Sequence, residues 1–202
     1  MKIQFALLFI LLIGVFACKE NKPSPPDQEP SFSIGLISTS YGKMYFWLHN
    51  ETPLHKAKFI ELANAKHYNQ FTFNRVVKNF VIQGGCPDSV QYFKDSPYLL
   101  DPEFNDSLKH IYGALGMGRD NNAGKQSNAC QIYIVNKEQG LPNLDGDYMI
   151  FGQIIQGTEV LETIEKVATD GNDKPLVDIL MEVSIQAFTA QELKNSFGFE
   201  VL

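Results

Sequence analysis

The sequence predicts a mainly β domain: a closed antiparallel barrel of eight strands, capped by two helices and followed by a C-terminal helix. Three observations favour this class. About eight segments have the short apolar pattern of strands, and only two internal segments have helical spacing. Two apolar runs also flank Lys78-Asn79 within FNRVVKNFVIQGG, residues 73–85, and predict a hairpin. The alternative, a parallel α/β sheet, is disfavoured by the hairpin and by the shortage of helices.

The N-terminal residues 1–17 differ in composition from the rest of the chain. One lysine precedes an almost unbroken apolar run, which is shorter than the roughly 20 residues needed to span a bilayer, so we expect an export signal. The ending Val15-Phe16-Ala17-Cys18 resembles a bacterial lipobox, which implies cleavage before Cys18 and lipidation of that cysteine. Phe16 is bulkier than this pattern usually shows, and ordinary signal-peptide cleavage is the alternative. The expected location is the bacterial cell envelope, with a lipid anchor in a membrane, and the Lys19-Glu20 pair hints at the outer one.

Residues 18–31 follow the signal and are rich in Pro and charge, with almost nothing apolar. Such a segment cannot pack into a core, and it is expected to be a flexible tether. The remaining residues, 32–202, form one expected domain.

The first helix of this domain is predicted to begin at Thr52-Pro53, with Thr as the cap and Pro at the first helical position. A second helix is expected at residues 159–167, and a third begins with a capping box of Thr189 and Glu192 and ends near Gly198. The buried positions expected on the first two helices are Leu54, Ala57, Ile60, Ala63, Val160, Leu161, Ile164 and Val167. Besides the hairpin, strands are expected at residues 32–37, 43–49, 113–117, 131–135, 149–154 and 179–188, with an irregular stretch at 86–110.

The hairpin raises a question about Arg75. With an ideal two-residue turn at Lys78-Asn79, Arg75 shares a face with Phe73 and Ile82. A charge on an apolar face must be paired or have a function.

Charge and motifs exclude several functions. The formal net charge of −6 argues against a nucleic-acid partner. Residues 118–127 lack the Gly and Ser/Thr positions of a phosphate-binding loop. No metal site is expected, because His49, His55, His67 and His110 lack ligand spacing, and each is predicted to lie at the surface.

Two cysteines, Cys86 and Cys130, remain beyond the lipobox. In an exported chain they are able to form a disulfide, and the alternative is two separate buried thiols. The sequence does not supply the Cα separation that decides between these.

The segment FNRVVKNFVIQGG resembles the core signature of the cyclophilins, peptidyl-prolyl cis-trans isomerases, and further similar blocks follow in order at residues 103–117, 131–135 and 144–157. The resemblance runs from residue 32 to 188 and implies catalysis by Arg75 with Gln83, without a cofactor or metal. It implies that Pro-containing protein segments bind to a second set of residues: Phe80, Val81, Gly118, Arg119, Gln131, Tyr133, Leu144 and Tyr148. A monomer is expected.

A few residues depart from the pattern of the family or from the geometry of an ideal hairpin. Gln83 falls opposite Arg75 on the ideal hairpin, so either a bulge intervenes or the turn is not two residues long. Asn74 and Asn143 replace residues usual in the family, and Tyr133 adds a hydroxyl that needs a partner. Asn74 and Asn143 motivate a second hypothesis, a binding module for Pro-containing segments with little turnover.

Overall fold

The computed structural model describes residues 29–89, 93 and 97–201. The predicted export signal, Cys18 and most of the tether lie outside the described residues. Helices are α1 (Pro53–Asn64), α3 (Thr158–Ile164) and α4 (Ala190–Phe197), with 3₁₀ turns η1 (His67–Gln70) and η2 (Pro142–Leu144). Strands are β1 (Ser31–Thr39), β2 (Gly42–Leu48), β3 (Thr72–Val77), β4 (Val81–Gly85), β5 (Leu99–Leu100), β6 (Ala114–Gly118), β7 (Ser127–Val135), β8 (Met149–Gln156), β9 (Ile179–Leu180) and β10 (Glu182–Thr189).

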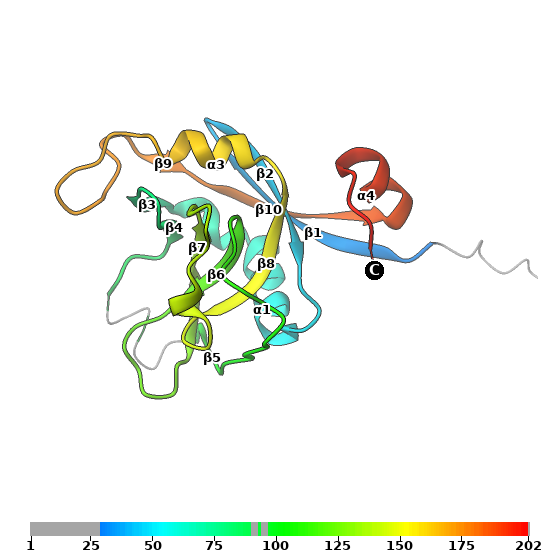
Figure 1. Ribbon diagram of the computed structural model, residues 1–202, viewed down its shortest axis with the longest axis horizontal. Helices are drawn as coiled ribbons and strands as arrows, with labels where there is room; N and C mark the ends of the chain where they lie inside the picture. Colours follow the sequence, from blue (N-terminus) through cyan, green and yellow to red (C-terminus); the bar gives the residue numbers. More distant parts are fainter. Residues whose placement is uncertain (1–28, 90–92, 94–96, 202) are drawn as a thin grey trace, which may run out of the picture.

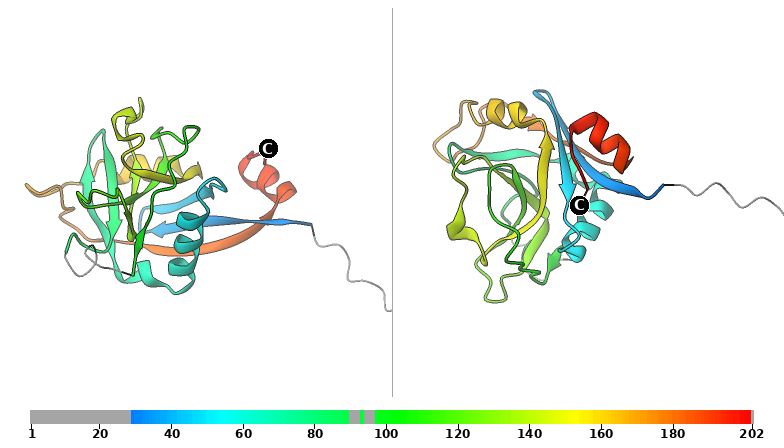
Figure 2. Two further views of the ribbon diagram at one scale, coloured as in Figure 1. Left: turned by 90° about the horizontal axis from the view of Figure 1, so that it is seen from below. Right: turned by 45° about the vertical axis from the view of Figure 1, so that its right-hand side comes forward.

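The strands form one curled antiparallel sheet (Figures 1 and 2). Its hydrogen-bonded order is β10-β1-β2-β8-β6-β7-β4-β3-β9, and β5 pairs with β7. The predicted closed eight-stranded barrel is therefore wrong: the sheet is an open half-barrel whose end strands, β9 and β10, do not pair. The physical reason is that β9 and β10 are successive parts of one extended segment, separated only by Met181. That segment pairs with β3 at its start and with β1 along the rest. A continuous stretch of backbone, rather than a pair of hydrogen-bonded strands, therefore connects the two ends of the sheet.

The concave side of the sheet and helix α1 enclose the main core. Strand β2 alternates as expected, with Met44, Phe46 and Leu48 buried. Phe59 of α1 packs against Phe151 of β8, with ring centroids 5.2 Å apart. All nine residues of β7 are buried, because a second apolar cluster covers the other face of this part of the sheet. This second cluster consists of Val81, Ala114, Tyr133, Val135, Leu141 and Ile150.

Helix α1 begins where the sequence predicts, but its buried face differs from the predicted one. His55, Phe59, Leu62 and Ala63 face the core, and of the four predicted positions only Ala63 is buried. Leu54 is 54% exposed. The cap also differs, because the Thr52 side chain makes no capping hydrogen bond.

A carboxylate from a distant loop explains both differences at the start of α1. Glu103 accepts hydrogen bonds from the backbone N–H groups of Leu54 at 3.0 Å and His55 at 2.9 Å. Its Oε2 also lies 2.6 Å from His55 Nδ1, so the imidazole is paired and can face inward while Leu54 turns to solvent. The prediction that all four histidines lie at the surface is wrong: His55 and His110 are buried, and His49 and His67 are partly buried.

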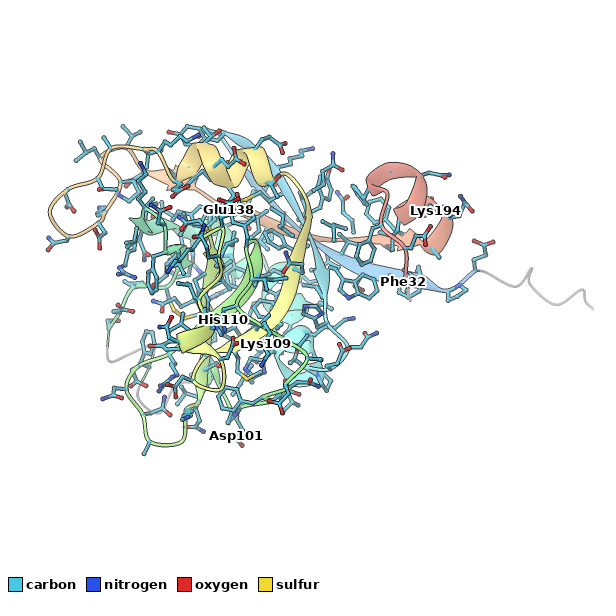
Figure 3. The ribbon with its side chains drawn as sticks, viewed as in Figure 1. Phe32, Asp101, Lys109, His110, Glu138 and Lys194 are labelled. Carbon is cyan, nitrogen blue, oxygen red and sulfur yellow. A yellow bond between two sulfur atoms is a disulfide. The ribbon has the colours of Figure 1, made fainter. Side chains whose placement is uncertain are left out.

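The other two helices agree more closely with the sequence. Helix α3 buries Val160, Leu161 and Ile164. Helix α4 has the predicted capping box, in which the Thr189 side chain and Glu192 satisfy each other's backbone N–H groups, and it ends at Gly198. Phe197 of α4 lies 5.0 Å from Tyr45 between ring centroids, so aromatic packing holds the helix against the sheet. Figure 3 shows Lys194 of α4 and Phe32 of β1 at the end of the molecule away from His110. Among residues 29–89, 93 and 97–201, no helix has both the length and the apolar character to cross a membrane.

Candidate functional site

The hairpin of β3 and β4 brings Arg75 and Gln83 together. The predicted two-residue turn is wrong, because Val77 pairs with Val81 across a three-residue loop, in which Asn79 takes a left-handed φ of 57°. The register also shifts between Phe73 and Arg75. As a result Arg75 lies directly opposite Gln83, whereas Phe73 turns into the core. Both explanations that the sequence left open, a bulge and a longer turn, are present.

A cavity of about 160 Å³ opens beside this hairpin. All ten residues that the resemblance assigns to catalysis and substrate binding line it, together with Asp88, which the sequence analysis missed. Asn143, by contrast, is exposed and does not line it. The lining residues are Arg75, Phe80, Val81, Gln83, Asp88, Gly118, Arg119, Gln131, Tyr133, Leu144 and Tyr148.

Arg75 lies at the rim of this cavity and is partly exposed to solvent. Its Nε is 3.6 Å from Asp173 Oδ2, and its guanidinium carbon is 5.9 Å from the centroid of the Phe80 ring. The ion pair is exposed on both sides, 38% for Arg75 and 47% for Asp173, so its contribution to stability is small, about 0–1 kcal/mol. The charge that the sequence places on an apolar strand face therefore avoids the core and points over the cavity.

Arg119 has a different environment, because its guanidinium is held by the protein. Its Nε donates to Asp147 O at 2.7 Å, and its Nη1 donates to Asp120 O at 3.1 Å. The guanidinium carbon lies 4.8 Å from the Tyr148 ring centroid, and the side chain is only 10% exposed. Arg119 therefore joins two loops and fixes the Tyr148 wall of the cavity.

Gln131 is held by the segment that follows β4. Its Nε2 donates to Cys86 O at 3.1 Å and to Asp88 Oδ1 at 2.7 Å. A Cβ atom at Gly118 would lie 2.0 Å from Gln131 Oε1, so a larger residue there would displace the Gln131 side chain. No spacing rule links Asp88 to the motif, and only the three-dimensional contact with Gln131 brings it to the cavity.

The disulfide that the sequence left open is present. Cys86 and Cys130 are bonded, with their Cα atoms 5.5 Å apart. The backbone N–H of Cys86 also donates to Cys130 O at 2.9 Å. The bond therefore joins the end of β4 to β7 beside Gln131.

The hydroxyl of Tyr133 also has a partner. Tyr133 is buried at the floor of the cavity, and its Oη lies 2.9 Å from His110 Nε2. His110 Nδ1 lies 2.7 Å from Asp145 Oδ1 on its other side. Burial lowers the pKa of His110, although Asp145 partly opposes this effect.

Comparison with known proteins agrees with this arrangement. The family model for the cyclophilin type peptidyl-prolyl cis-trans isomerases matches residues 35–185. Peptidyl-prolyl cis-trans isomerase CYP18-2 of Arabidopsis thaliana is 33% identical over 159 residues, 77% of this chain and 90% of that protein. CYP18-1 of the same plant is 38% identical over 141 residues, 68% of this chain and 86% of that protein. A crystal structure of a cyclophilin-type isomerase of Cryptosporidium parvum, in the presence of the dipeptide Ala-Pro, has a TM-score of 0.68 and 30% identity, and the match covers 76% of this chain and 98% of that one.

The fold and these relatives define the chain as a peptidyl-prolyl cis-trans isomerase. It belongs to the cyclophilin family, because the family model covers well over half of its residues. Helix α4 and the outer ends of β1 and β10 lie outside the matched range.

Proposed function

We propose that the chain isomerises Xaa-Pro bonds of exported or envelope proteins, with Arg75 as the catalytic group and the cavity as the proline site. The observation that carries this proposal is the convergence of Arg75, Gln83 and eight other residues on a single cavity. Rotation about an Xaa-Pro bond must break amide resonance, a barrier of about 18–20 kcal/mol. No covalent bond is made or broken, so the reaction requires neither a nucleophile nor a bound metal.

Arg75 acts on the prolyl nitrogen in this mechanism. As the amide twists, the nitrogen becomes pyramidal and gains a lone pair. The guanidinium donates a hydrogen bond to this lone pair, which is available only in the twisted state, and so lowers the barrier. Val81, Tyr133 and Leu144 hold the proline ring from below while the preceding carbonyl group rotates.

NMR exchange spectroscopy on an Ala-Pro test peptide tests this function. Uncatalysed cis-trans exchange takes tens to hundreds of seconds. We expect catalytic amounts of the protein to make this exchange much faster. If the peptide bound, as shown by chemical-shift changes at the cavity, and exchange were not accelerated, the binding-module hypothesis motivated by Asn74 and Asn143 would replace the enzymatic one.

The lipid anchor and the envelope location are part of the proposal. The lipobox-like ending at Cys18 and the disulfide support them, since disulfides persist mainly in oxidising compartments. In a bacterial host fed a labelled fatty acid, we expect the full chain to carry the label and to sediment with membranes. Cys18→Ser is expected to abolish both, and label that persisted in this variant would contradict lipidation at Cys18. The clients are Pro-containing segments of other exported chains, and the protein is proposed to act as a monomer.

A further inference from the structure

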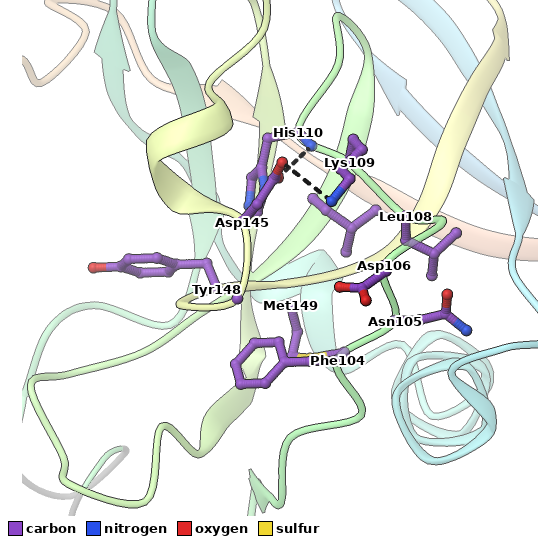
Figure 4. A pocket seen from close by; sticks show the side chains of 11 residues that line it. Phe104, Asn105, Asp106, Leu108, Lys109, His110, Asp145, Tyr148 and Met149 are labelled. Atoms are coloured by element: carbon purple, nitrogen blue, oxygen red, sulfur yellow. Dashed lines mark hydrogen bonds and ion pairs between the residues drawn. The ribbon is translucent and has the colours of Figure 1, made fainter.

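Tyr133, His110 and Asp145 form a buried chain of hydrogen bonds that begins at the cavity floor. The chain ends at a second cavity of about 150 Å³, where Asp145 lies beside Lys109 (Figure 4). His110 lines that second cavity and not the proline site, so the resemblance gives it no role. The direction of each hydrogen bond in this chain follows from the chemistry of the three groups.

Asp145 determines which imidazole nitrogen carries the proton. Its Oδ1 faces both the backbone N–H of His110 at 3.0 Å and Nδ1 at 2.7 Å. Partial burial raises the pKa of Asp145, but the hydrogen bonds from His110 outweigh this effect and leave the pKa lowered. The carboxylate is therefore ionised at neutral pH, accepts from both groups and keeps the proton on Nδ1.

With Nδ1 protonated, neutral His110 presents a lone pair at Nε2. The Tyr133 hydroxyl must then donate to it across the 2.9 Å contact. The alternative acceptor, Met149 O, lies 3.5 Å away, which is long for a hydrogen bond. The hydroxyl proton is thus directed away from the proline site.

The ring of Tyr133 is also confined by its neighbours. It lies parallel to the His110 imidazole, with an interplanar angle of 5°, and edge-on to Tyr148. A Cβ atom at residue 116 would lie 2.2 Å from Tyr133 Cζ, so the tyrosine needs Gly116 beside it. Gly116 therefore provides space for the end of the ring, and His110 provides an acceptor for its hydroxyl.

We infer that His110, oriented by Asp145, is a positioning residue for the isomerisation. It holds the Tyr133 ring in the orientation on which the substrate proline packs. The inference rests on the proposed role of the cavity as the proline site. If His110 cannot accept, the buried hydroxyl is left without a good partner, and the ring must shift toward another one.

The test compares His110→Phe with the double variant His110→Phe/Tyr133→Phe. We expect the single variant to lower kcat/KM for an Ala-Pro peptide about tenfold, mostly through a higher KM. The double variant removes the orphaned hydroxyl as well and is expected to recover most of this loss, because a hydrogen bond removed at both ends costs little. His55→Phe is the matched control, since it removes another buried histidine paired with a carboxylate, Glu103, outside the cavity.

A pH profile separates positioning from general stability. Within the part of the chain that the structure describes, the charged or titratable groups around His110 are Asp145, Lys109, Asp106, Tyr133 and Tyr148. When His110 is protonated at low pH, Nε2 becomes a donor, and the Tyr133 hydroxyl must turn to accept from it, which leaves the hydroxyl proton without a close acceptor. We therefore expect kcat/KM to fall at a pH below the ordinary histidine value of about 6.5, because burial lowers the pKa of His110. Asp145→Asn is expected to move this fall to lower pH, because it removes the charge that favours protonated His110, and the double variant should lack it.

Each outcome is decisive. Equal kinetics for His110→Phe and His55→Phe, with both variants folded by circular dichroism and the parent active, would overturn the inference and leave the proposed function standing. The inference would also be overturned if His110→Phe/Tyr133→Phe did not recover the kcat/KM lost in His110→Phe. If the parent bound the peptide without isomerising it, the proposed function would fail, and the same comparison of variants would be made on the dissociation constant measured by NMR titration. There the inference requires weaker binding for His110→Phe and recovery in the double variant.

Discussion

Replacing Arg75 with alanine is expected to lower kcat/KM for an Ala-Pro peptide by about 10- to 100-fold. A charge-assisted hydrogen bond is worth about 1.5–3 kcal/mol, and each 1.36 kcal/mol of barrier is a tenfold change in rate. Because the bond to the prolyl nitrogen exists only in the twisted state, we expect the loss mainly in kcat. NMR exchange spectroscopy at several peptide concentrations separates kcat from KM.

Two further variants sharpen this prediction. Arg75→Lys keeps the charge but loses the planar fork, and we expect it to recover only a small part of the rate. Lys174→Ala is the control, because it removes a cation from the loop that carries Asp173 without touching the cavity. Arg75→Ala should remain folded, since the pair with Asp173 is exposed and contributes little to stability. Catalysis at the parent rate in folded Arg75→Ala would rule out the arginine mechanism.

The strand pattern was largely predictable from the sequence because it depends on local alternation. All eight expected strands are present, the last one divided into β9 and β10 at Met181. Closure of the barrel was not predictable in this way, since it depends on which distant edges pair. The same limit applied to the hairpin, where one residue more in the turn reverses the face of every side chain that follows.

The inward face of α1 shows a second limit. The apolar residues Leu54 and Ala57 were expected inside, but the Glu103 carboxylate allows His55 to take an inward position. A buried polar residue cannot be inferred from periodicity when its partner comes from a distant loop. The family resemblance located ten residues that line the cavity, whereas Asp88, Asp173 and His110 became visible only through their contacts.

Loss of the disulfide is the second large effect that we expect. Cys86 and Cys130 are separated by 44 positions, and a bridge that closes a loop of this size typically adds about 2–4 kcal/mol to the free energy of unfolding. In a domain of this size, each kcal/mol shifts Tm by about 2–4 °C, so Cys86→Ala/Cys130→Ala should lower Tm by about 5–15 °C. Thermal unfolding followed by circular dichroism measures this shift.

The fold should survive this change, because the neighbouring ladder remains. Gly85 still pairs with Gln131, and the backbone N–H of residue 86 still donates to the carbonyl of residue 130. Reductant should lower the Tm of the parent by a similar amount and leave the double variant unchanged, with thiol labelling to show that the parent is reduced. A fully reduced parent with an unaltered Tm would contradict the stabilising role. We also expect a modest rise in KM when the bond is broken. Residues 86–88 accept the hydrogen bonds that orient the Gln131 side chain, and without the disulfide this segment is tied to β7 by hydrogen bonds alone.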